Sequence, residues 1–150
     1  MFNDDKFVDV KKSMDDAKVI FNNGDFDSAM DKVEKITSEI VNISLRTDSS
    51  DNQQNAKLLD TATYVATNLD LVANRIGDEN MRHSIIECRN SMVETVRPII
   101  IRYIDKALML YRYMSNLIES GNTSAVPMDV YSRASEMQET IRMLRKYWAA

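Results

Sequence analysis

Glycine and proline are scarce in this chain of 150 residues, which contains three glycines and two prolines. Glycine interrupts helices through its backbone freedom, and proline does so through its missing amide hydrogen and its ring. A chain with so few of these residues has few turns and suits long helices. Gly24, Gly77 and Gly121 all stand where a run of helical periodicity stops. We therefore expect each of them at the end of a helix.

Cysteine and histidine are rarer still, with one of each. A single cysteine excludes an internal disulfide, and the first residues do not form a basic region followed by an apolar stretch, as a secretory signal would. The most apolar run, residues 98–118, carries four charged residues, too many for a membrane span. The sequence predicts a cytoplasmic protein without a membrane segment.

Positive charge is also in short supply, since 19 Lys and Arg face 23 Asp and Glu and the formal net charge is -4. The excess of acid comes from residues 1–50, which hold eleven acidic and seven basic side chains. Proteins that bind nucleic acid ordinarily present a basic face to the phosphates. The charge balance argues against nucleic acid as a partner and favours another protein.

Apolar residues are plentiful, at 44% of the chain, and they recur at steps of three and four, the spacing of one face of a helix. No segment alternates at the period of two that a half-buried strand needs. The fold class predicted is all-α, a five-helix bundle without a β-sheet. The first helix is expected at about residues 4–22, and the second begins at Phe26 and fades at Leu45. The third carries an apolar stripe from Leu59 to Ile76 and stops at Gly77, Asp78 caps the fourth, which continues to Ile118, and Pro127 opens the fifth.

We expect one helical domain, residues 1–150, in three parts. Residues 1–45 form an acidic hairpin with Asp25 as the N-cap of its second helix, residues 46–55 form a mobile polar loop, and residues 56–150 form the remaining bundle.

The fourth helix contains Pro98, which either kinks one long helix or opens a new one. We favour the kink because no glycine or polar loop residue accompanies the proline. Residues 99–118 are apolar on nearly every side, so this stretch is expected to be the central helix, buried by its neighbours or by another subunit.

Potential metal ligands share one side of the fourth helix at Glu79, His83 and Glu87. A di-iron bundle needs a Glu-x-x-His step on two helices, and this chain has only one histidine. Exposed charge pairing at a spacing of four residues explains the three side chains more simply. We expect no cofactor, and we keep these residues as an alternative metal site.

A catalytic nucleophile is not evident either. Cys88 stands five residues after His83, about 140° around a helix, so the imidazole cannot face the thiol from the same helix. We expect Cys88 to be a small core residue. The glycines do not form a phosphate-binding loop. The sequence predicts that the protein is not an enzyme.

Aromatic and apolar residues in the fourth helix provide the positive signal for function. They are predicted to bind a protein partner or a second copy of the chain, because aromatic anchors carry much of the energy of an interface. The alternative is a purely internal helix. The residues of this predicted partner site are Tyr103, Leu110, Tyr111, Tyr113 and Met114.

The predicted function is a non-enzymatic protein-interaction domain: an adaptor, a chaperone or a subunit of a larger assembly, such as a viral one. One alternative is a bundle that binds a small ligand or a metal. The other is a nucleic-acid accessory protein that uses Arg142 and Arg145 in the last helix.

The segment Ala17-x3-Phe21-x2-Gly24-Asp25-Phe26-x2-Ala29 resembles the centre of a tetratricopeptide repeat, and the resemblance covers one hairpin, residues 7–45. It departs from the repeat at Ile36 and Val41, and no second copy follows 34 residues later. The hairpin, together with Leu110-Tyr111-x-Tyr113-Met114 and Trp148, is also similar to helical export chaperones of the flagellin type. Either resemblance implies protein binding in a helical groove.

Overall fold

The computed structural model describes residues 5–48, 50–121, 142, 144 and 148. Every regular element among these residues is a helix, so the all-α prediction is confirmed for this part of the chain. The chain divides into two compact units, residues 1–96 and residues 97–150.

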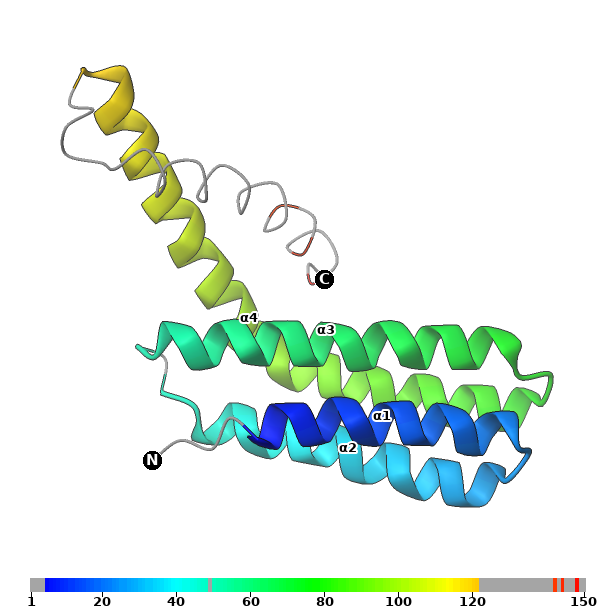
Figure 1. Cartoon of the computed structure of the whole chain (residues 1–150). Helices are drawn as coiled ribbons and strands as arrows, with labels where there is room; N and C mark the ends of the chain where they lie inside the picture. Colours follow the sequence, from blue (N-terminus) through cyan, green and yellow to red (C-terminus); the bar gives the residue numbers. More distant parts are fainter. Residues whose placement is uncertain (1–4, 49, 122–141, 143, 145–147, 149–150) are drawn as a thin grey trace. The chain divides into compact units, whose positions relative to one another are not determined.

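The first two helices, α1 (Asp5–Asn22) and α2 (Phe26–Arg46), form the predicted hairpin (Figure 1). Gly24 adopts a φ of 87°, a left-handed conformation that residues with a side chain avoid, and this ends α1. The Asp25 carboxylate then accepts a hydrogen bond from the Ser28 amide at 3.3 Å and caps α2. The predicted turn and N-cap are both confirmed.

The third helix, α3 (Asn52–Arg75), begins inside the segment that was predicted to be a loop. The prediction of a loop over residues 46–55 is wrong for Arg46, which belongs to α2, and for residues 52–55. Asp51 caps α3 by accepting from the Gln54 amide at 3.1 Å. Gln54 and Asn55 are polar but buried, so a first turn made of polar residues was mistaken for a loop.

The fourth helix, α4 (Glu79–Glu119), is continuous and contains Pro98, so this proline does not open a separate helix. The kink at Pro98 stays a prediction. The residues that the structure describes form four long helices, not five. The predicted fifth helix falls on residues outside this description, apart from Arg142, Leu144 and Trp148, which are helical.

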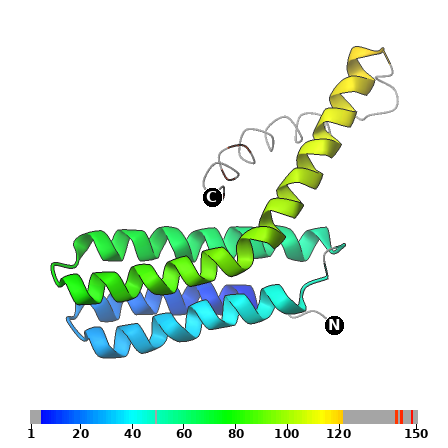
Figure 2. The same ribbon diagram turned by 180° about the vertical axis from the view of Figure 1, so that it is seen from behind.

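In the first unit, α1, α2, α3 and the first part of α4 lie side by side (Figure 2). Two hydrogen bonds link α1 to α3, one from Lys11 to Asp60 and one from the Tyr64 hydroxyl to Asp15. Both pairs are separated by 49 residues, so the two helices run parallel in a fixed register.

The core of this unit contains most of the apolar stripes that the spacing predicted, together with Leu58 and Val65 of α3, which were not part of the predicted stripe. Met81, which was predicted on the stripe of α4, is only half-buried. On α1 the stripe is buried along its whole length, and the stripes of α2 and α3 join it. Burial of a large aliphatic side chain stabilises a fold by about 1.5–3 kcal/mol. The largest fully buried side chains of this unit are Met14, Val33, Ile40, Ile43, Leu58, Val65, Leu69, Ile85 and Met92. None of the described helices is both long and apolar enough to cross a membrane.

Candidate protein-binding face

The second half of α4 carries two apolar stripes on opposite sides. Ile100, Ile104 and Leu108 follow one another at steps of four, and they are at most 6% exposed. Met109, Leu110 and Tyr113 lie within a little more than one turn, and they are 67%, 59% and 62% exposed. At about 100° per residue, these three side chains point away from the buried stripe. We call Met109, Leu110 and Tyr113 the α4 face.

The chain itself therefore does not bury residues 99–118 on every side. The alternative of a purely internal central helix is wrong for the three side chains of the α4 face, because they stand in solvent. Burial of this face by a second molecule stays a prediction. Single exposed apolar residues are ordinary, but several large ones on one turn are typical of a surface that binds another protein.

The charges beside the α4 face are positive. Lys106 and Arg102 are exposed and precede it by about one and two turns, respectively, on the same side of the helix. Asp105 and Glu119, the acidic residues of this half of α4, project from other sides of the helix. The surface therefore combines an apolar centre with basic residues at one end.

The predicted partner residues have different positions. Leu110 and Tyr113 belong to the α4 face, whereas Tyr103 is half-buried, and desolvation raises the pKa of its phenol. The side chains of Tyr111 and Met114 lie outside the described residues. Met109 was missed, although its spacing of four from Tyr113 would have placed it on the same side.

The alternative metal site is not assembled. His83 Nε2 lies 3.1 Å from Glu87 Oε1, but the Glu79 carboxylate accepts a hydrogen bond from Arg82 Nη1 at 3.0 Å. All three predicted ligands are more than two-thirds exposed. No group of three or more His, Cys, Asp or Glu side chains that could hold a metal occurs among the residues described.

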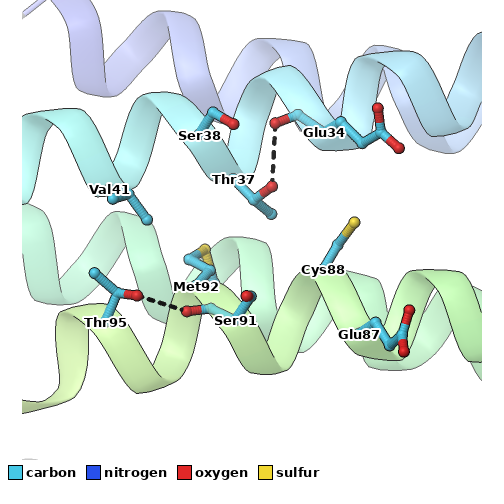
Figure 3. Close-up of a pocket in the computed structure, with 9 residues that line it drawn as sticks. All are labelled: Glu34, Thr37, Ser38, Val41, Glu87, Cys88, Ser91, Met92 and Thr95. Carbon is cyan, nitrogen blue, oxygen red and sulfur yellow. Dashed lines mark hydrogen bonds between the residues drawn. The ribbon is translucent and has the colours of Figure 1, made fainter.

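A groove between α2 and the first part of α4 contains Cys88 and has a volume of about 440 Å³ (Figure 3). The Thr37 hydroxyl donates to the Glu34 carbonyl, and the Thr95 hydroxyl donates to the Ser91 carbonyl. These two hydroxyl groups therefore satisfy the backbone of their own helices, as such groups commonly do.

Cys88 is half-buried in the wall of this groove, so the prediction of a core position is wrong. The side chain reaches the surface because α2 leaves the groove open at this level. Desolvation raises the pKa of the thiol, and the nearby carboxylates of Glu34 and Glu87 raise it further. A nucleophilic cysteine needs the opposite shift, because the thiolate is the reactive form. The groove therefore offers no activated nucleophile.

The alternative of nucleic-acid binding was predicted for Arg142 and Arg145. Arg142 is exposed, whereas Arg145 lies outside the described residues. Trp148 is fully buried, and its carbonyl oxygen accepts a hydrogen bond from Arg97 Nε at 2.8 Å. The prediction that Trp148 belongs to a core stripe agrees with this burial.

Among the described residues, the α4 face is thus the feature most typical of a binding protein. No model of a known protein family, no curated protein and no solved structure matches this chain.

Proposed function

We propose that this chain is a non-enzymatic protein-interaction domain, serving as an adaptor, a chaperone or a subunit of a larger assembly. The exposure of Met109, Leu110 and Tyr113 on one side of α4 carries this proposal. Each such side chain gains about 1.5–3 kcal/mol when it is fully buried. Three of them on one turn supply the apolar centre from which small helical interfaces draw most of their energy.

The chemistry of the surface also indicates the kind of partner. A partner helix with an apolar stripe would cover the α4 face, and an acidic residue beside that stripe would meet Arg102. The weak resemblances to a tetratricopeptide hairpin and to flagellin-type export chaperones favour the same class of function. A second copy of the chain is the other candidate partner.

The mass of the purified chain in solution, measured by light scattering, tests the proposal. We expect an oligomer, or a stable complex with a protein that co-purifies from the native source. The variant Leu110→Asp places a charge in the centre of the α4 face. It should weaken the association by about tenfold or more, because a buried unpaired charge costs more than 1.4 kcal/mol.

Leu45→Asp provides the matched control, since Leu45 is 70% exposed at the end of α2 in the first unit. This variant should associate like the wild type, and circular dichroism should show unchanged helicity for both. A monomeric wild type without a co-purifying partner would contradict the proposal. An equal loss of association in both variants would show that the α4 face is not the interface.

A further inference from the structure

A pocket of about 310 Å³ lies at one end of the first unit, where α1 ends, α2 begins and α3 ends. The end of α1 adjoins the start of α2 in the sequence, but the end of α3 is distant from both, so no single sequence motif indicates the pocket. Apolar side chains form its floor and polar ones its rim. The lining residues are Lys18, Phe21, Asn22, Phe26, Leu71, Val72, Arg75, Ile76 and Gly77.

The floor of this pocket is aromatic and aliphatic. The rings of Phe21 and Phe26 have their centroids 6.3 Å apart and are inclined by 40°, so they form an open corner. Val72 and Ile76 are each 7% exposed and close the bottom, whereas Leu71 is 46% exposed beside the opening. Such a floor suits a flat or aliphatic group of a ligand.

The rim carries two cations, Lys18 and Arg75, that form no ion pair with a described residue. The register between α1 and α3 explains why Lys18 has none. The Lys11–Asp60 and Asp15–Tyr64 hydrogen bonds join residues 49 apart, and the same separation places Thr67 opposite Lys18. Lys18 therefore faces a threonine on α3, whereas Lys11 faces the acidic Asp60.

Arg75 is not needed to cap the end of α3. Arg82 already binds the end of α3, since its Nε donates to the Ala73 carbonyl at 3.2 Å and its Nη2 donates to the Ile76 carbonyl at 2.6 Å. Asp25 and Asp78 in the adjoining turns cap helices, since Asp25 accepts from the Ser28 amide and Asp78 accepts from the Met81 amide, and neither lines the pocket. Among the residues that line the pocket, the charged ones are Lys18 and Arg75, and both are positive.

We propose that this pocket binds a small carboxylic acid with an apolar, preferably aromatic, body. The body would lie against Phe21 and Phe26, and the carboxylate would lie between Lys18 and Arg75. Arginine pairs with carboxylates through two parallel hydrogen bonds, which makes it suited to such a group. The volume is at the lower end of the range of about 300–1,000 Å³ for ligand sites, so a ligand of amino-acid size fits best.

Titration of the full-length, ¹⁵N-labelled chain with 3-phenylpropionate, followed by NMR, tests this proposal. We expect shifts of the amide signals of Gly77 and of the other lining residues. The neutral analogue 3-phenylpropanamide should bind about tenfold more weakly, because it loses charge-assisted hydrogen bonds. Equal binding of the acid and the amide, or no shift at the pocket up to millimolar ligand, would overturn the proposal.

Substitutions of the lining residues test which side chains bind 3-phenylpropionate. Lys18→Met and Arg75→Met should each weaken binding of 3-phenylpropionate by about five- to tenfold, and Leu71→Glu should abolish it by placing a carboxylate at the opening. Lys12→Met is the matched control, because Lys12 is an exposed lysine of α1 that does not line the pocket. If Lys12→Met weakened the binding of 3-phenylpropionate as much as Lys18→Met does, the overall charge of the chain would explain the loss, and a specific site would be refuted. Leu110→Asp should bind like the wild type, since the pocket does not depend on the α4 face.

Discussion

Helix α1 and the second half of α4 place large apolar residues at similar spacings, yet their surroundings differ. On α1 the stripe from Phe7 to Phe21 is at most 6% exposed, and the polar side of the helix is linked to α3 and α2 through Lys11, Asp15 and Asp16. On α4, one stripe is buried and the α4 face is not. The spacing of apolar residues therefore predicts which of them share one side of a helix, but it does not predict what packs against that side.

The largest expected difference between these regions is in stability. Leu69→Ala removes a fully buried side chain from α3 in the first unit and should lower the free energy of unfolding by about 2–5 kcal/mol. Leu110→Ala truncates a residue that is 59% exposed and, at concentrations too low for association, should change this free energy by less than about 0.5 kcal/mol. Urea unfolding, followed by circular dichroism, measures both values. A loss of several kcal/mol for Leu110→Ala would show that this residue belongs to a core.

Much of the first unit could be predicted because its signals are local. The turn at Gly24, the cap at Asp25 and the stripe of α1 depend on neighbouring residues alone. The start of α3 was missed because Gln54 and Asn55 are polar, and their burial depends on the packing of distant helices. The polar composition of residues 46–55 predicted a loop. Asp51, whose residue type is typical of an N-cap, indicated the start of α3 that the structure has.

The surfaces proposed to bind a partner or a ligand were harder to predict, for the same reason. Leu110 and Tyr113 were named from their residue types, but the sequence alone did not separate them from the half-buried Tyr103. The pocket beside Phe21 and Arg75 was not predicted at all. Its walls come from three helices, and only the register between α1 and α3 brings Lys18 and Leu71 to one opening.

A smaller effect on the free energy of unfolding is expected at the start of α3, where the side chain of Asp51 caps the helix. Asp51→Ala removes the acceptor of the Gln54 amide and should destabilise the fold by about 1 kcal/mol. Asp51→Asn keeps an oxygen at this position and should cost much less. Urea unfolding of the two variants gives the comparison. Equal losses would mean that the charge of Asp51, and not its capping oxygen, is what matters.

The smallest expected effect is a pH dependence that differs between two tyrosines, one in each unit. A hydrogen bond to Asp15 is the main cause that raises the pKa of Tyr64, followed by desolvation and the negative charge of Asp15, whereas desolvation raises the pKa of Tyr103. In both cases the folded state holds the phenol proton more tightly than the unfolded chain does. The resulting stabilisation is complete below the unfolded pKa of about 10 and is lost as the pH rises through the raised pKa.

Tyr64→Phe and Tyr103→Phe should therefore each lose less stability than the wild type between about pH 9 and pH 11, a range that spans the ordinary tyrosine pKa. Asp15→Ala separates the two causes, because it removes both the hydrogen-bond acceptor and the charge beside Tyr64 and leaves the surroundings of Tyr103 unchanged. In the Asp15→Ala background, Tyr64→Phe should have little further effect on the alkaline slope, whereas Tyr103→Phe should keep its full effect. Urea unfolding at several pH values measures these slopes. If Asp15→Ala left the contribution of Tyr64 intact, the link between α1 and α3 would not govern this tyrosine, and burial would be the common cause in both units.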